Sequence, residues 1–221
     1  HYIRNLQLKP SGSPVLLYNG AYKNRQDVHH RVLKIDVGTY NLQQCADAVM
    51  RIRAEYFYNY KRFKKIRFNF TSGHTIYFYK WALGYRPRVA GRRVFFVKSG
   101  KRDFSYKNFR KYLIRIYQYA GSMSLSRELK RVNNINNIMI GDVFIKGGFP
   151  GHAVFVVDVA KHIKTGKKIF LLAQSYMPAQ EIHILKNFTN DSLSPWYSVD
   201  FGIELKTPEW TFNKKHLKRF K

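Results

Sequence analysis

The sequence has little cysteine, little acid and no long apolar run. Among its 221 residues there is one cysteine, Cys45, and there are only 13 Asp and Glu. A single cysteine excludes a disulfide within the chain, so oxidising and reducing compartments both remain open. No apolar run reaches the ~18 residues that a membrane-spanning helix needs. The sequence therefore predicts no transmembrane segment.

The N-terminus also lacks the usual starting signals. The chain opens with His1-Tyr2-Ile3-Arg4, without an initiator Met or the apolar core of a signal peptide. Such an opening is typical of a trimmed or mature product.

The composition is that of a folded protein. Hydrophobic residues make up 45% and aromatic residues 16% of the chain, which excludes a disordered tail. The length suits a single domain with a full core. We expect an N-terminal arm over residues 1–31 and one domain over 32–221, with a basic insertion at about 59–104.

Positive charge is abundant. The formal net charge is +27, and residues 51–102 hold 15 Lys and Arg against one acid, Glu55, a net +14. Such a surface attracts polyanions, which include nucleic acid, anionic lipid and acidic envelope polymers. The alternative is a solvated basic shell that serves solubility alone.

Aromatic residues interleave with these charges, as they do in nucleic-acid stacking platforms. Residues 67–71 nevertheless alternate like a half-buried strand, so core packing also explains their aromatics. No zinc-finger spacing and no RNA-binding aromatic motif accompanies the basic segment. Nucleic-acid binding stays an alternative.

Two helices have clear sequence signals. In the first, Asn41 is the expected N-cap and Gln44 completes a capping box, which places Cys45 near the helix start on its apolar stripe. The second is expected over 106–119 with Ser105 as its cap. A strand at 32–37 precedes the first helix, and a short helix at 125–132, capped by Ser124, follows the second.

The last third of the chain is rich in β-signals. Strands are expected at 142–145, 152–160, 168–174, 182–185 and 201–205. The links between them are too short for crossover helices, which predicts a mostly antiparallel sheet. Helices followed by strands indicate an α+β domain.

Cys45, His152 and Gln174 are the candidate catalytic residues. A helix N-terminus favours a thiolate, although a cysteine on an apolar stripe can equally be a buried core residue. Gly151-His152 opens a strongly apolar run, so the imidazole lies at a sheet edge, where a base can meet the thiol. Gln174, in the next strand, can orient that base. His183 and Gln180 are alternatives for this orienting role.

No metal site and no cofactor are expected. The remaining histidines, among them His29, His30 and His74, lack the partner spacing of a zinc site.

Two resemblances follow from these segments. Gly141-Asp142-Val143-Phe144-Ile145 and Gly151-His152-Ala153-Val154-Phe155-Val156-Val157-Asp158 look like the core of the NlpC-type papain-like cysteine peptidases. Gln44-Cys45-Ala46-Asp47-Ala48-Val49 is similar to the start of their cysteine-bearing helix. Nearly the whole chain more closely resembles a bacterial family catalogued as a domain of unknown function, number 4846. Its hallmarks appear as Gln43 to Arg51, Tyr119-Ala120-Gly121, Gly141 to Phe144 and Leu172 to Gln180.

The superfamily resemblance implies a papain-like core, with a cysteine-bearing helix packed on the sheet and a long helical and basic insertion. It implies Cys45 as nucleophile, His152 as base and Gln174 as the third polar residue. Backbone N–H groups with the Gln43 or Gln44 side chain would hold the oxyanion. The implied activity is hydrolysis of an amide or peptide, with cell-wall peptides as substrate, at the bacterial envelope or outside the cell.

Two other functions stay open. One is a basic binding module for nucleic acid or an anionic envelope polymer. The other is an inert scaffold of the same fold, in which Cys45 does not react.

Overall fold

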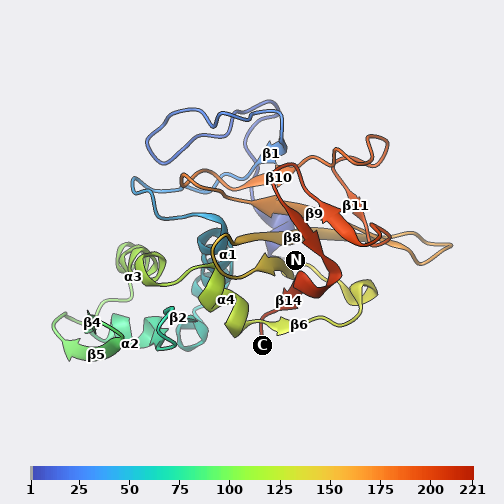
Figure 1. The fold of residues 1–221 in the computed structure, drawn as a ribbon. Helices are drawn as coiled ribbons and strands as arrows, with labels where there is room; N and C mark the ends of the chain where they lie inside the picture. The colour runs from blue at the N-terminus through green and yellow to red at the C-terminus, as the bar shows by residue number, and fades with distance from the viewer. Residues whose placement is uncertain (1) are drawn as a thin grey trace.

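The computed structural model describes residues 2–221 and is built on one twisted, eight-stranded sheet (Figure 1). The strands run in the order β1-β10-β9-β8-β7-β14-β6, and β11 pairs with the other end of β9. All of these pairings are antiparallel. The α+β class and the mostly antiparallel sheet are confirmed.

The helices and strands have the following bounds. The α-helices are α1 Cys45–Asn59, α2 Phe78–Ala82, α3 Tyr106–Tyr119 and α4 Ser122–Glu128. The strands of the large sheet are β1 His29–Val32, β6 Lys130–Arg131, β7 Val143–Lys146, β8 His152–Lys161, β9 Lys168–Gln174, β10 His183–Leu185, β11 Tyr197–Ser198 and β14 Leu217–Arg219. Three separate hairpins are formed by β2 Arg67–Asn69 with β3 Thr75–Tyr77, β4 Tyr85–Ala90 with β5 Arg93–Lys98, and β12 Glu204–Lys206 with β13 Thr211–Asn213.

The central strand β8 is buried on both faces, because successive side chains of a strand point to opposite sides. Ala153, Phe155 and Val157 belong to a core shared with the helices. Val154 and Val156 belong to a second core closed by the C-terminal segment, which contributes Leu205 and Phe212. This double coverage explains why β8 is a continuous apolar run rather than an alternating one.

The first helix starts later than the sequence indicates. Gln44, not Asn41, is the N-cap of α1, and its backbone N–H donates to Oδ2 of Asp47 at 3.1 Å. The amide oxygen of Asn41 instead accepts from the backbone N–H of Ala179, 2.7 Å away. That contact comes from a segment far along the chain. The result is that Cys45 is the first residue of the helix.

Other predicted elements shift as well. The strand predicted at 32–37 is wrong beyond Val32: β1 covers His29–Val32, where β10 lies beside it, and the chain then leaves the sheet. The helix predicted at 125–132 lies at Ser122–Glu128 with Gly121 as its N-cap, because Lys130–Arg131 pairs with β14. The strand predicted at 201–205 is the short β12 at Glu204–Lys206, which pairs with β13 in a separate two-stranded sheet. In contrast, α3 and its Ser105 cap are confirmed, with Ser105 Oγ accepting from Asn108 N at 3.3 Å.

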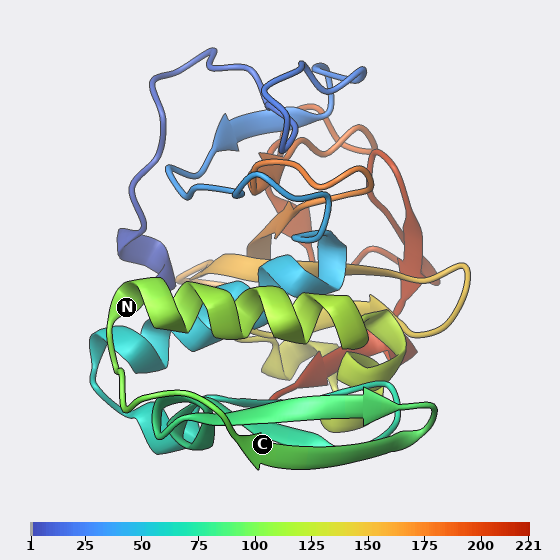
Figure 2. The same cartoon turned by 90° about the vertical axis from the view of Figure 1, so that its left-hand side faces the viewer.

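The basic segment forms a layer of its own beside the helices. It contains β2–β3, α2 and the β4–β5 hairpin, and the hairpin lies below α3 in Figure 2. The chain begins in the middle of the molecule, where Ile3–Asn5 contacts β8, and then crosses the upper part before it leads into β1 (Figure 1).

Candidate active site

A cavity of about 370 Å³ lies where α1 begins and β8 starts. Cys45 and His152 both line it, although 106 residues of chain separate them. The other lining residues are polar, glycine or apolar: Asn41, Leu42, Gln44, Ala46, Asp47, Tyr117, Ala120, Gly121, Ser122, Gly148, Phe149, Pro150, Gly151, Tyr176, Met177 and Trp210.

Cys45 contributes its thiol from the first residue of α1. Burial raises the pKa of this thiol to about 11, and the Asp47 carboxyl group acts in the same direction. Hydrogen bonds from the backbone N–H groups of Ala153, Ala46 and Cys45 lower the pKa but do not offset burial. The sulfur is therefore a neutral thiol near pH 7.

His152 is the first residue of β8 and is almost fully buried. Burial, opposed by the hydrogen bond to Gln174 and aided by the charge of Lys23, lowers the pKa of His152 to about 4. The rings of Tyr176 and Trp210 lie over the imidazole, with centroids 4.7 and 5.3 Å from its own. The imidazole is thus neutral near pH 7 and shielded from bulk water.

Gln174, at the end of β9, holds one ring nitrogen of His152. Its Oε1 lies 2.8 Å from Nε2 of His152, and its Nε2 lies 2.7 Å from Oε2 of Glu209 and 3.4 Å from Nε2 of His183. Nδ1 of His183 lies 2.9 Å from the carbonyl oxygen of Glu181, so that nitrogen carries the proton and Nε2 accepts.

This set of partners fixes the proton on His152. The amide nitrogen of Gln174 donates to two acceptors, Glu209 and His183, so its oxygen must face His152. An amide oxygen only accepts, and therefore Nε2 of the neutral His152 carries the hydrogen. Nδ1 is left as the basic nitrogen.

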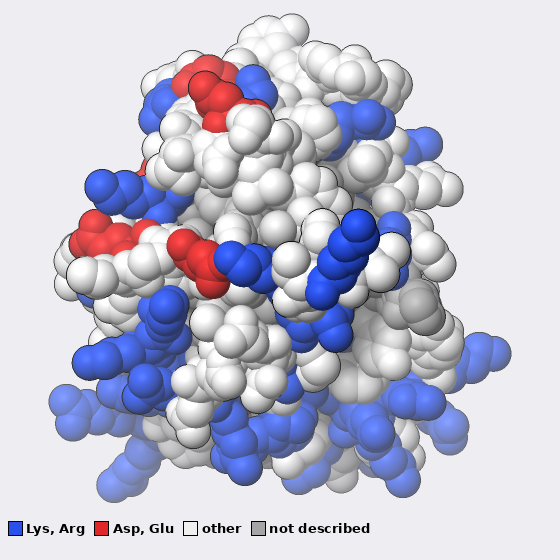
Figure 3. Space-filling view, turned by 90° about the vertical axis from the view of Figure 1, so that its right-hand side faces the viewer, with Lys and Arg blue, Asp and Glu red and all other residues white. Residues whose placement is uncertain are grey.

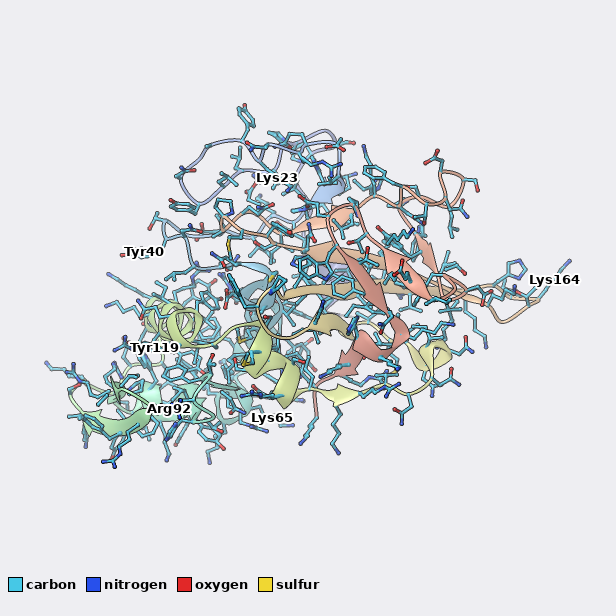
Figure 4. All side chains as sticks on the ribbon, viewed as in Figure 1. Lys23, Tyr40, Lys65, Arg92, Tyr119 and Lys164 are labelled. Carbon is cyan, nitrogen blue, oxygen red and sulfur yellow. The ribbon has the colours of Figure 1, made fainter. Side chains whose placement is uncertain are left out.

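The chain of contacts from His152 through Gln174 and Glu209 continues to Lys23 in the N-terminal arm. Nζ of Lys23 lies 2.5 Å from Oε1 of Glu209 and 5.5 Å from the centre of the Tyr176 ring. Both charged side chains are nearly buried, with 7% and 11% of their surface exposed. Lys23 reaches this position from the upper part of the molecule (Figure 4). An arm residue thereby neutralises the carboxylate behind the candidate base.

The two glutamines before Cys45 have different positions. Gln44 lines the cavity, and its Nε2 donates to Oδ1 of Asn41 at 3.3 Å. Gln43 does not line this cavity: it is 1% exposed and its Oε1 accepts from Nη1 of Arg51 at 3.0 Å. The structure brings Cys45, His152, Gln174 and Gln44 together. Gln43 is buried outside the cavity, where it contacts Arg51.

Gly151 allows the strand that carries His152 to lie this close to α4. A Cβ atom on Gly151 would stand 2.4 Å from the carbonyl oxygen of Gly148 and 2.5 Å from Oγ of Ser122. Contacts that short do not occur in proteins, so any side chain here would push the start of β8 away from the cavity.

The alternative residues are placed differently. His183 touches Gln174 rather than His152, and Nε2 of Gln180 donates to the carbonyl oxygen of Pro178 at 2.9 Å. Across residues 2–221, His, Cys, Asp and Glu side chains form no group able to hold a metal ion.

Sequence reasoning missed Lys23, Glu209, Tyr176 and Trp210. Lys23 comes from the N-terminal arm, whereas the adjacent Glu209 and Trp210 come from the C-terminal segment, so these three reach the site from distant parts of the chain. A local signal exists only for Tyr176, which follows Gln174 by two residues.

The fold and the cavity define an α+β protein in which a helix-borne cysteine and a strand-borne histidine share one cavity. The chain belongs to the family described as "Domain of unknown function (4846)", whose family model matches residues 1–219. No curated protein and no solved structure matches the chain. None of the helices within residues 2–221 has both the length and the apolar character needed to cross a bilayer.

Proposed function

We propose that this protein is a papain-like, NlpC-type cysteine hydrolase that cleaves an amide or peptide bond with Cys45, His152 and Gln174. One observation carries the proposal. Cys45 and His152 line the same cavity, and Gln174 occupies Nε2 of the imidazole. Nδ1 is therefore the nitrogen that remains to take the thiol proton.

The reaction begins from a neutral pair. The pKa values of about 11 for Cys45 and about 4 for His152 favour thiol and imidazole over an ion pair. Nδ1 of His152 takes the proton as the sulfur attacks the carbonyl carbon, and then gives it to the leaving amine. Water next attacks the thioester, the carboxylic acid leaves, and the thiol is restored.

The start of α1 supplies the oxyanion donors. Ala48 N–H already bonds to the carbonyl oxygen of Gln44 at 2.9 Å, whereas the N–H groups of Cys45 and Ala46, at the helix start, stabilise negative charge on the sulfur. An oxyanion formed on a carbon bound to that sulfur lies next to the same N–H groups. The Gln44 amide lines the cavity and is the side chain placed to assist.

The lining of the cavity favours an uncharged peptide segment. The chain has 40 Lys and Arg, yet none of them lines this cavity. Side-chain amides, the Ser122 hydroxyl and glycine backbone groups suit the hydrogen bonds of a peptide. Exposed Phe149 and Met177, 98% and 63% accessible, offer apolar contacts at the rim. Cell-wall peptides, which are peptide segments on an anionic polymer, fit both this cavity and the basic surface outside it.

Glu209 and Lys23 act as positioning residues in this proposal. Glu209 accepts a hydrogen bond from the amide nitrogen of Gln174, and Lys23 forms a nearly buried ion pair with the Glu209 carboxylate. Together they keep Oε1 of Gln174 on His152 and thus keep Nδ1 free of a proton.

The test is acylation of Cys45 by a small activated ester such as p-nitrophenyl acetate. We expect a burst of nitrophenol, an acetyl group on Cys45 by mass spectrometry, and slow turnover. Cys45→Ala should abolish the burst, and His152→Ala should slow it by about a hundredfold, in the range of general-base catalysis. His74→Ala, which changes a histidine outside the cavity, is the matched control.

Absence of acylation in the folded wild-type protein would contradict the proposal and favour the inert scaffold. If His152→Ala acylates at the wild-type rate, Cys45 is a reactive thiol that reacts without His152 as its base. If the burst is observed, incubation of the protein with cell-wall peptide fragments of defined composition, followed by analysis of the products, identifies the bond that is cleaved.

A further inference from the structure

The β4–β5 hairpin is the least enclosed part of the basic segment. Within residues 2–221 it is a two-stranded sheet that pairs with no other strand, and it lies at the lower left of Figure 1. The two ends of the hairpin lie in close contact, because a Cβ atom on Gly84 would stand 2.1 Å from the carbonyl oxygen of Gly100. The hairpin is therefore a defined structural element.

The register of the hairpin separates its two faces. Val89 pairs with Val94, and both pack against the main core, so this face points to the body of the protein. The neighbouring pair, Arg88 with Phe95, lies on the opposite face because adjacent pairs alternate. Val97 lies on the same outer face as Phe95, two residues along the strand.

The outer face places apolar and cationic side chains side by side. Phe95 is 52% exposed and Val97 is 39% exposed, both on β5. Three exposed arginines surround these two side chains: Arg88 on β4, Arg92 in the turn and Arg93 at the start of β5. Phe96, on the other face, is also 39% exposed, with Nζ of Lys80 5.9 Å from its ring centre.

No acid neutralises these cations. The sequence has no Asp or Glu between Glu55 and Asp103, and in the part of the chain that is described no hairpin Arg or Lys forms a salt bridge. Positive charge also extends over the lower half of the face shown in Figure 3, while the acids of that view lie higher. The lower part of the molecule thus attracts an anionic surface.

We propose that the outer face of the β4–β5 hairpin docks on an anionic lipid surface. Phe95 and Val97 enter the boundary between headgroups and acyl chains, while Arg88, Arg92 and Arg93 bind phosphate oxygens. This contact removes from water the apolar side chains that the fold itself leaves exposed.

The side chains favour lipid over nucleic acid. A stacking platform for bases needs a series of aromatic faces, and the outer face of this hairpin offers only Phe95. Its apolar neighbour Val97 is aliphatic, which suits hydrocarbon and provides no face for a base. The inference does not depend on the reactivity of Cys45.

The β8–β9 turn provides a matched control within the same molecule. It has a 99% exposed Ile163 and the exposed lysines Lys161 and Lys164. Arg92 and Lys164 lie at opposite ends of the molecule in Figure 4. A binding mode that depends on net charge alone would respond equally to changes at either place.

The experiment is co-sedimentation of the full chain with vesicles of phosphatidylcholine alone or mixed with phosphatidylglycerol. We expect binding only to the mixed vesicles, weakened by salt. Arg88→Gln with Arg93→Gln should lower the partition coefficient by about tenfold or more. Phe95→Ser with Val97→Ser should lower it severalfold at unchanged charge.

The control pair Lys161→Gln with Lys164→Gln, and the control Ile163→Ser, should leave partitioning nearly unchanged. Equal losses in the hairpin and control variants would overturn the proposal in favour of general electrostatic attraction. Binding to oligothymidylate that displaces the protein from vesicles and depends on the same hairpin residues would also overturn it. Circular dichroism of each variant establishes that the fold is retained.

Discussion

Nε2 of His152 donates to Oε1 of Gln174 at 2.8 Å, and this one bond determines which imidazole nitrogen can act as a base. The amide is oriented by its own donation to Glu209 at 2.7 Å. Glu209, near the C-terminal end of the chain, thus determines which nitrogen of His152 is basic, although it does not contact His152.

The tautomer of His152 should depend on Glu209. In the wild type, nitrogen NMR of the imidazole should show the Nε2–H form alone. Glu209→Ala removes one of the two acceptors that orient the amide, so a second population with the proton on Nδ1 should appear. Acylation of Cys45 should slow by about tenfold, within the effect of a lost outer partner.

Glu204→Ala, in an exposed strand of the nearby hairpin, is the control for loss of a carboxylate. An unchanged tautomer in Glu209→Ala would refute the positioning role while leaving the role of Cys45 untouched. Unchanged acylation with an altered tautomer would instead separate His152 from the reaction.

Alkylation of Cys45 should report a neutral thiol. Burial raises the thiol pKa to about 11, so the rate of labelling by iodoacetamide should be low near pH 7 and rise through the alkaline range. An unstructured cysteine peptide, whose labelling rate is half-maximal near pH 8.5, is the reference. A plateau already present at pH 7 would indicate a preformed thiolate–imidazolium pair and exclude the neutral starting state.

Asp47 should make folding stability depend on pH. Burial raises its pKa from 3.8 to about 8, so between these values the native state holds a proton that the unfolded chain has released. The contribution of Asp47 to stability therefore falls as pH rises from about 4 to about 8. Asp47→Asn keeps the acceptor for Gln44 N–H and removes the titration.

The free energy of unfolding of Asp47→Asn relative to the wild type should increase across that pH range, by on the order of a few kcal/mol. Urea unfolding at several pH values measures it. The buried histidines titrate alike in both proteins, so their effects cancel in the difference. A difference that does not change with pH would show that Asp47 ionises normally.

Loss of the Arg51 side chain should lower the free energy of unfolding. Its Nε lies 2.6 Å from Oε1 of Glu55, and both side chains are nearly buried. Arg51→Ala leaves that carboxylate unpaired inside the protein, at an expected cost of about 3–5 kcal/mol in unfolding free energy.

Arg110→Ala is the matched control. Its partner is Asp36, 3.4 Å away, whose side chain is 77% exposed, so the expected loss is roughly 0–1 kcal/mol. Similar losses for the two variants in urea unfolding would show that burial of the Arg51–Glu55 pair has no special role.

Local patterns determined a large part of the fold. The apolar stripe and Ser105 cap fixed α3, and the apolar runs fixed β7, β8 and β9 to within a residue or two. These elements are set by periodicity and capping, which act within a few residues. The three segments that bear Cys45, His152 and Gln174 were for the same reason recognisable in the sequence.

Tertiary contacts decided the rest. Asn41 bonds to Ala179 instead of capping a helix, and α4 ends where β14 pairs with Lys130–Arg131. Lys23 and Glu209 meet behind Gln174 across 186 positions of the chain. No periodicity or spacing encodes such a meeting, because it depends on how the arm and the C-terminal segment pack on the sheet. The sequence by itself therefore determined which residues are candidates, and only the packed structure decided the protonation and orientation that their chemistry requires.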